Sequence, residues 1–138
     1  MAAMMAQLYV DDPSPHAPDE LGARRTLLKL DEEPTRGRAI VLESEGVVVG
    51  YALLCAFWSN ELGGEICVID EIYVKPPYRG NGIATWLVHK LLEHALPWFT
   101  DCVAVELEVT PSNARARALY ERLGFRVKKN AVLRYELK

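Results

Sequence analysis

Residues 69–84 read IDEIYVKPPYRGNGIA, and this stretch decides the fold. An apolar β-type run leads into a glycine-rich turn that carries one arginine, Arg79, and an amphipathic helix begins at once at Ile83. The backbone N–H groups from Gly80 to Ala84 have no acceptors within such a helix, and the helix dipole adds positive potential at the same place. Together with the Arg79 cation they favour an anion, so we expect this turn to hold a pyrophosphate.

The chain before this stretch predicts two helices followed by strands. Helical patterns cover Met1–Val10 and Glu20–Leu30, and β-type runs cover Ala39–Leu42, Val47–Leu54 and Glu65–Val74. Residues 43–46 form a hairpin signal between the first two runs, and residues 59–64 form a loop before the third. We therefore expect the three strands to be joined by hairpins.

The chain after the turn predicts a helix, a strand and a second helix. The first helix runs from Ile83 until Pro97 ends it, and Val103–Val109 alternates apolar and polar residues as a half-buried strand does. A connection through a helix makes this strand parallel to the one before it. Ser112 is the expected N-cap of the second helix, which ends before Gly124, and residues 126–138 are expected to supply one or two closing strands.

Length and composition indicate one compact α/β (α+β) domain over residues 1–138. Half of its 138 residues are hydrophobic, enough for a single core. We expect a mixed, mostly antiparallel sheet over residues 39–138 with helices on both faces, and a helical part over residues 1–38. The formal charge of −3 gives no reason to expect nucleic acid as a partner. No apolar run is long enough to span a membrane and no signal peptide is recognisable, so we expect a cytoplasmic protein.

The cysteines and histidines show no metal-ligand spacing. Cys55, Cys67 and Cys102 are odd in number and lie in strand-like runs, so we expect reduced thiols and no disulfide framework. His89 and His94 are five residues apart, which separates them around a helix. No metal is therefore expected.

The glycine turn alone has several interpretations. A nucleotide triphosphatase loop needs a Lys-Ser or Lys-Thr pair after its last glycine, and a dinucleotide-binding turn needs a third glycine at position 85. Neither is present, because Ile83, Ala84 and Thr85 follow Gly82. A purely structural role, in which the glycines only turn the chain into a helix, stays open on this stretch alone.

A second group of residues favours a binding role. Asn113, Ala116 and Tyr120 share one helical face, with Asn113 and Tyr120 about 10 Å apart along the axis. The small Ala116 leaves space between them, so a slender chain with amide groups fits there. The alternative is that Tyr120 is an ordinary core residue beside Leu119 and Leu123.

The glycine turn and the Asn113–Tyr120 motif together make the sequence resemble the GNAT superfamily of acyl-CoA-dependent N-acetyltransferases. The acetyl-CoA signature of that superfamily is Arg or Gln, two residues, Gly, one residue, then Gly or Ala, which Arg79, Gly82 and Ala84 match, together with the frequent Gly80. Its later motif is met by Asn113, Ala116, Leu119, Tyr120, Gly124 and Phe125. The resemblance covers the chain from about Ala39 onward.

The resemblance implies where acetyl-CoA binds, namely in a V-shaped opening of the sheet between the strands that end near Val74 and Val109. Backbone groups of Ile72, Tyr73 and Val74 would pair with the pantetheine arm, and Arg79, Gly80, Asn81, Gly82, Ile83 and Ala84 would hold the pyrophosphate. Asn113 and Ala116 would line the site, and Tyr120 is placed like the general acid. A tyrosine with a pKa near 10 is protonated at neutral pH and can donate to a departing thiolate.

The acceptor side rests on weaker patterns. A primary amine arrives protonated and needs a base, for which Asp70 and Glu71 are the candidates; adjacent strand residues face opposite ways, and the resemblance slightly favours Glu71. Trp58 and Glu61 suit a cationic acceptor, although an exposed hairpin tip is the favoured explanation of these residues. The first two helices would border this side.

These observations predict direct transfer of acetyl from acetyl-CoA to a primary amine in a ternary complex. No acyl-cysteine is expected, because no cysteine falls on the two motifs. The acceptor is a small molecule or a peptide whose identity stays open, and the resemblance also allows a homodimer. Two alternatives remain: a catalytically silent module that binds or senses acyl-CoA, and a structural interaction protein that does not bind coenzyme.

Overall fold

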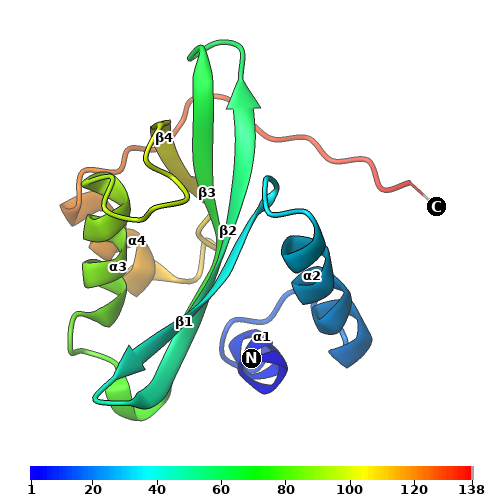
Figure 1. Ribbon diagram of the computed structural model, residues 1–138, viewed down its shortest axis with the longest axis vertical. Coiled ribbons are helices and arrows are strands. Elements are labelled where there is room, and N and C mark those ends of the chain that lie inside the picture. Colours follow the sequence, from blue (N-terminus) through cyan, green and yellow to red (C-terminus); the bar gives the residue numbers. More distant parts are fainter. Residues whose placement is uncertain (138) are drawn as a thin grey trace.

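The computed structural model describes residues 1–137 (Figure 1). Its elements are α1 (Ala2–Asp11), α2 (Glu20–Glu32), β1 (Gly37–Ser44), β2 (Val47–Ser59), β3 (Gly64–Val74), the 3₁₀ turn η1 (Pro76–Tyr78), α3 (Ile83–Leu92), β4 (Cys102–Leu107) and α4 (Ala114–Arg122). Both helices and all three strands predicted ahead of the glycine turn are present. None of the helices in this part of the chain has the length and hydropathy needed to span a membrane.

The four strands form one mixed sheet in the order β1-β2-β3-β4. β1 pairs with β2 and β2 with β3 in antiparallel fashion, whereas β3 and β4 are parallel. The parallel pair is joined through α3, which confirms the predicted crossover. Glu45 and Gly46 turn the first hairpin with φ angles of 51° and 77°, values that a tight two-residue hairpin turn requires.

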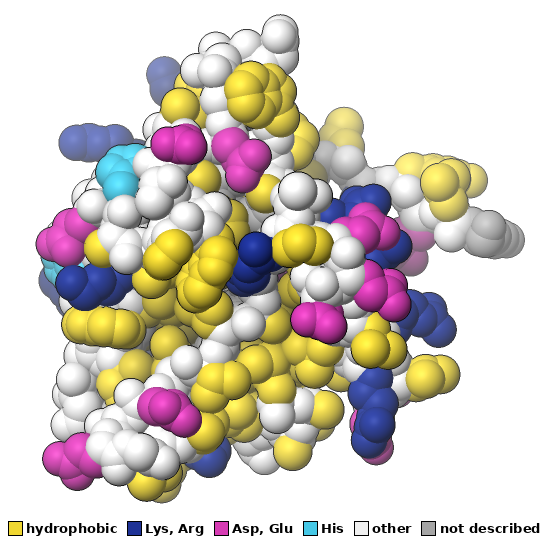
Figure 2. Space-filling view, viewed as in Figure 1, with side chains coloured by type: hydrophobic (Ala, Val, Ile, Leu, Met, Phe, Trp, Pro, Cys, Tyr) yellow, Lys and Arg dark blue, Asp and Glu magenta, His cyan; other side chains and the backbone are white. Residues whose placement is uncertain are grey.

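Helices cover both faces of this sheet, with α1 and α2 on one side and α3 and α4 on the other (Figure 1). The face toward α3 and α4 buries the larger core, which includes Leu54, Leu87 and Val88. The face toward α1 and α2 buries a smaller core around Met5 and Tyr51. Charged side chains of both signs gather over α2 on the face shown in Figure 2, so this helix presents its polar side to solvent.

A β-bulge at Asp70 divides β3 into two parts. Leu53 and Leu54 pair with Glu71 and Ile69, which leaves Asp70 as the extra residue. The inserted residue reverses the alternation of side chains, so Ile69 packs toward α3 while Tyr73 packs toward α1. Pairing with β4 reaches no further than Ile69 opposite Leu107, and β3 continues to Val74 without it. The two parallel strands therefore part from this point on, as predicted.

Two boundaries differ from the sequence prediction. α4 begins after Asn113, whose side-chain Oδ1 accepts a hydrogen bond from the Ala116 N–H at 3.1 Å, so Asn113 and not Ser112 is the N-cap. α3 ends at Leu92 instead of reaching Pro97, and His94 just beyond it has a positive φ of 53°. A left-handed residue cannot continue a right-handed helix, which explains the earlier end.

The predicted closing strands are absent from residues 126–137, and Lys138 lies outside the described residues. Leu133, Tyr135 and Leu137 are 88–93% exposed, and the segment leads away from the body of the protein (Figure 1). Lys128 pairs with Glu106 at 3.0 Å and Glu136 pairs with His16 at 3.4 Å. The alternating apolar residues thus bury no face against the sheet, and without such a face a strand gains little stability.

Candidate functional site

A cleft of about 1110 Å³ opens where β3 and β4 part. It is lined by the end of β3, the glycine turn, the start of α3, the segment after β4, α4 and the end of α1. Most of the residues predicted to form the site line this cleft: Asp70, Glu71, Ile72, Tyr73, Val74, Arg79, Gly80, Gly82, Ile83, Ala84, Asn113, Ala116 and Tyr120. Two motifs about thirty residues apart in the sequence are therefore gathered around one cavity.

The glycine turn leaves the start of α3 open toward the cleft. Gly80 and Gly82 have φ angles of 80° and 77°, and a Cβ at either position would meet no atom within 4 Å. No side chain caps the helix at Gly82. The first N–H groups of α3 are thus accessible to a ligand, which is the geometry that an anion needs at a helix start.

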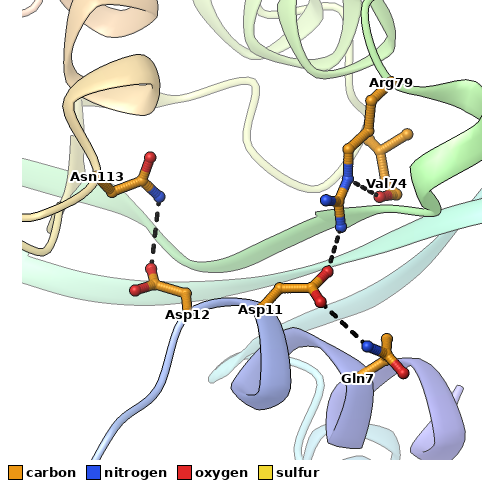
Figure 3. Close-up of polar contacts among 6 residues, drawn as sticks. All are labelled: Gln7, Asp11, Asp12, Val74, Arg79 and Asn113. Carbon is orange, nitrogen blue, oxygen red and sulfur yellow. Dashed lines mark hydrogen bonds and ion pairs between the residues drawn. The ribbon is translucent and has the colours of Figure 1, made fainter.

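Arg79 folds back from this turn over the end of β3. Its Nε donates a hydrogen bond to the Val74 carbonyl at 2.7 Å, and its guanidinium lies 5.4 Å from the centre of the Tyr73 ring. Its Nη2 donates to Oδ2 of Asp11, in the last turn of α1, at 2.5 Å (Figure 3). This bond, with a second from Gln7, lowers the pKa of Asp11. Arg79 is thereby tied to both β3 and α1.

Asp12 makes a matching set of contacts on the opposite side of the cleft. Its carboxylate accepts a hydrogen bond from Oγ1 of Thr110 at 3.0 Å. It accepts a second from Nδ2 of Asn113 at 3.4 Å, which Figure 3 shows. The Asn113 amide is thus engaged at both ends, because its oxygen caps α4. The end of α1 therefore bridges the two strands that part.

Glu71 is held by two tyrosines on the side of α1. Tyr9 Oη donates to Oε1 of Glu71 at 2.5 Å, and Tyr51 Oη donates to Oε2 at 2.8 Å. Burial, followed by these bonds to a carboxylate, raises the pKa of both phenols. Tyr51 is fully buried and its ring lies 5.9 Å from that of Tyr73. Both oxygens of Glu71 are consequently occupied by donors from α1 and β2.

Asp70 has a different environment although it is the preceding residue. Its side chain is exposed at the cleft, yet the surrounding protein raises its pKa by desolvation, and the nearby Glu108 carboxylate adds to the effect. A carboxylate with a raised pKa binds a proton more readily. Asp70 therefore combines access to the cleft with a raised pKa, whereas both Glu71 oxygens accept hydrogen bonds.

Tyr120 lies in α4 and reaches the cleft from the larger core. It is 7% exposed, and its ring meets Phe125 edge to face at 5.7 Å between centroids. Burial raises the pKa of its phenol. The hydroxyl consequently stays protonated across the neutral pH range and remains available as a donor.

Three predicted site residues are not gathered with the others. Trp58, 65% exposed, lines a separate hollow with Trp98 at the opposite end of β3, and Glu61 lies exposed in the turn between β2 and β3. Asn81 is within the glycine turn but donates its Nδ2 to the Tyr78 carbonyl at 3.1 Å. The alternative of a hairpin tip thus describes where Trp58 and Glu61 lie.

Four residues that the structure places at the cleft or against it belong to neither sequence motif: Tyr9, Asp11, Asp12 and Tyr51. Three belong to the end of α1, where the sequence shows only a helix followed by a Pro-containing turn. Tyr51 lies in an apolar strand, where an aromatic residue is expected anyway. Their partners are distant in the sequence, so no local signal identified them.

Neither thiols nor a metal group contribute to the cleft lining in residues 1–137. Cys55, Cys67 and Cys102 are free, and burial raises the pKa of all three thiols, to about 12 for Cys67. No three His, Cys, Asp or Glu side chains in this range are placed to bind a metal ion together.

The fold and the cleft define the class of the protein: an α/β domain with an open mixed sheet whose two parallel strands part at a cleft, beside the glycine turn that leads into α3. A family model described as the acetyltransferase (GNAT) family matches residues 2–125. The chain belongs to this family, whose members use acetyl-CoA as co-substrate.

Individual relatives agree with this assignment. The chain is 42% identical over 77 residues to a thialysine N-epsilon-acetyltransferase of Bos taurus, a match that covers 56% of this chain and 44% of that protein. It is 39% identical over 103 residues to an uncharacterized N-acetyltransferase of Methanocaldococcus jannaschii, covering 74% and 43%. The matches therefore span less than half the length of these relatives.

Among solved structures, a possible acetyltransferase from Clostridium difficile superposes with a TM-score of 0.83 at 22% identity, over 99% of this chain and 89% of that one. At this level of identity the likeness concerns the fold. It extends over the N-terminal helices as well as the sheet.

Proposed function

We propose that this protein is an N-acetyltransferase that moves the acetyl group of acetyl-CoA to a primary amine by direct attack in a ternary complex. One observation carries the proposal: the cleft joins the Arg79–Ala84 turn to Asn113, Ala116 and Tyr120, so that both motifs of the family face one cavity. The names of the relatives reported above support the same activity.

The chain offers a separate group for each part of acetyl-CoA, which supplies the acetyl group as an activated thioester. The N–H groups at the start of α3 and the Arg79 cation suit the pyrophosphate. The edge of β3 at residues 72–74 lacks a strand partner on the β4 side within the described chain. Backbone groups on this edge can therefore pair with the amides of a pantetheine arm, except the Val74 carbonyl, which accepts a hydrogen bond from Arg79. Ala116 keeps the passage between Asn113 and Tyr120 open.

Tyr120 is the proposed general acid, donating its Oη proton to the sulfur of the departing thiolate. Its buried phenol has a raised pKa and is protonated at neutral pH. A thiol has a pKa of about 8.5, so the thiolate accepts a proton readily from a positioned donor. The proton then leaves the enzyme with the coenzyme thiol.

Asp70 is the proposed base that takes the proton from the incoming ammonium, directly or through water. The family resemblance slightly favours Glu71, but both oxygens of Glu71 already accept hydrogen bonds from tyrosines, so neither oxygen is open to the incoming ammonium. Asp70 has a raised pKa and faces the cleft. Glu71 is then better suited to attract the cationic acceptor than to deprotonate it.

Direct transfer suits this cleft better than an acyl-cysteine route. A cysteine nucleophile reacts as its thiolate, and burial raises the pKa of each of the three thiols. None of the three lines the cleft. The acceptor amine would consequently attack the thioester itself, brought into position by the ternary complex.

A thiol-release assay with acetyl-CoA and a panel of primary amines tests the proposal, together with calorimetry of coenzyme A binding. The panel should include lysine, thialysine, polyamines and peptide N-termini. We expect coenzyme binding and, with at least one amine, thiol release above the rate without acceptor. Binding without release for any amine indicates a silent acyl-CoA module, and absence of binding removes the proposal.

A matched pair of arginine variants assigns the binding to the cleft. Arg79→Ala should weaken coenzyme A binding, whereas Arg24→Ala, on the exposed side of α2 with a side chain 67% exposed, should not. Equal affinity in both variants would show that Arg79 does not contact the coenzyme.

A further inference from the structure

The end of α1 occupies the groups that the proposed function assigns to acetyl-CoA. Asp11 binds Nη2 of Arg79 at 2.5 Å, and Asp12 accepts a hydrogen bond from Asn113 on the other rim of the cleft (Figure 3). Asp12 also accepts a hydrogen bond from Thr110 on that rim. Two adjacent carboxylates thus lie across the opening between β3 and β4. They place negative charge where the coenzyme would bring its own.

A pyrophosphate and the Asp11 carboxylate compete for the same cation. The free donors of Arg79 are limited, since its Nε is already bound to the Val74 carbonyl and one terminal nitrogen to Asp11. Like charges a few ångströms apart repel, most strongly where protein excludes water. The coenzyme and Asp12 also compete for Asn113. The side-chain oxygen of Asn113 caps α4, so its Nδ2 group is the part left to bind a ligand, and this group donates to Asp12.

We propose that Asp11 and Asp12 act as an internal ligand of the cleft, which must leave Arg79 and Asn113 before acetyl-CoA binds. The inference rests on the proposed function, because it assumes that the coenzyme uses these two residues. The carboxylates lower the affinity for the coenzyme by stabilising the closed, ligand-free state. Cofactor binding therefore includes a movement at the end of α1.

The structure restricts this movement to the residues after Tyr9, which include the last two residues of α1 and the connection that follows. Met5 is 1% exposed within the smaller core, and Tyr9 holds Glu71 of β3, so the body of the helix is anchored. Residues 12–19 connect α1 to α2 without a helix or strand. This connection can shift the two aspartates without unpacking the core.

The strength of the internal contacts sets the size of the expected effect. The side chains of Arg79 and Asp11 retain 37% and 29% of their exposure, so solvent screens the pair. Removing such a pair should tighten coenzyme binding about 1.5- to fivefold, as expected for a partly exposed charge contact. The gains in coenzyme affinity from removing the Asp11 and Asp12 charges should be only partly additive, because both aspartates move with the same segment.

Calorimetric titration with coenzyme A tests the inference on the full chain. Asp11→Asn and Asp12→Asn keep the size and polarity of the side chains but remove the charge. The matched control is Glu20→Gln, which removes an acid from α2 whose side chain is 73% exposed and paired with Arg24. We expect tighter binding in each aspartate variant and in the double variant, and unchanged binding in the control.

Unchanged or weaker binding by both aspartate variants, measured beside a wild type that binds coenzyme A, overturns the inference and leaves the proposed function intact. Absence of binding in every protein removes the proposed function and the inference with it. Thermal melts confirm that each variant is folded. If Asp11→Asn unfolds, Asp12→Asn alone decides the question, because its contacts lie on the opposite rim.

Discussion

Asp70 and Glu71 are adjacent in β3 and both line the cleft, although neighbouring side chains of a regular strand point to opposite faces. The β-bulge explains this, since Asp70 is the unpaired extra residue opposite Leu53 and Leu54. The bulge gives the two acids different surroundings: two phenols bind Glu71, whereas Asp70 lies exposed near Glu108. The two tyrosines hold the Glu71 carboxylate in place, whereas the Asp70 carboxylate is exposed at the cleft.

Asp70→Asn should lower kcat strongly and leave coenzyme A affinity nearly unchanged, because the base acts on the acceptor and not on the coenzyme. Loss of a general base costs about 10²- to 10⁴-fold in rate. Steady-state kinetics and calorimetry measure the two quantities. Glu71→Gln is the comparison: if Glu71→Gln loses kcat to this extent while Asp70→Asn does not, the roles are reversed.

Glu108→Gln should shift the acidic limb of the kcat/KM profile to lower pH. Activity requires ionised Asp70 and therefore falls as pH decreases through its pKa. That pKa is raised first by desolvation and second by Glu108, so removing the Glu108 charge lowers it. The shift should stay below about one pH unit, because solvent screens exposed carboxylates. A limb that moves upward or stays in place would exclude Asp70 as its origin.

Asp70→Asn also has a predictable effect on stability. The pKa of Asp70 is raised in the folded protein above its ordinary value of 3.8, so the fold favours the protonated form. The associated stability is fully present below pH 3.8 and is lost as pH rises through the raised pKa. The neutral Asn should therefore raise Tm at pH 7 but not at pH 3. The gain in the free energy of unfolding at pH 7 should be less than about 1 kcal/mol, because the side chain is exposed. Thermal melts at the two pH values provide the measurement.

Tyr120→Phe should reduce turnover while coenzyme A affinity and Tm stay close to wild type. The substitution removes only the hydroxyl, and the ring keeps its contact with Phe125. Loss of a general acid costs about 10²- to 10⁴-fold in kcat. Wild-type turnover in this variant would remove Tyr120 from the mechanism.

The patterns that depend on neighbouring residues predicted most of the fold. The alternation after Cys102 gave β4, the Glu43–Gly46 signal gave the first hairpin, and the helix after Gly82 gave the parallel crossover. The prediction of closing strands was wrong. Alternating apolar and polar residues indicate that a strand could have one apolar face, but the apolar side chains between residues 126 and 137 are exposed and pack against no part of the described chain. A two-residue repeat of apolar side chains does not show whether another element of the fold covers them.

The candidate site was only partly predictable, for the same reason. The glycine turn and the α4 motif are local and were found, whereas the bulge at Asp70 has no glycine or proline to mark it. Tyr9 reaches Glu71 from 62 positions away and Asp12 reaches Asn113 from 101 positions away. Such contacts depend on how the helices dock on the sheet, which no window of sequence contains.

Tyr51→Phe should destabilise the fold more than Tyr9→Phe. Tyr51 is fully buried beside the carboxylate of Glu71, and loss of a buried hydrogen bond to a charged group costs about 1.5–3 kcal/mol. Tyr9 is only half-buried, so water replaces its hydroxyl more easily. Urea unfolding measures the difference. Tyr135→Phe, with a side chain 88% exposed, is the control and should leave the free energy of unfolding unchanged.

Gly82→Ala and Gly46→Ala form a pair that separates backbone strain from ligand binding. Both glycines have a φ of 77°, and a Cβ at either position meets no atom within 4 Å. Each substitution should therefore cost about 1 kcal/mol of stability for the left-handed backbone.

Only Gly82 lies at the cleft, at the start of α3, whereas Gly46 turns the distant β1–β2 hairpin. Coenzyme A affinity should fall in Gly82→Ala alone, because the added methyl group stands at the start of α3, where the proposal places the pyrophosphate. Equal losses of affinity in the two variants would show that stability, and not contact at the turn, controls binding.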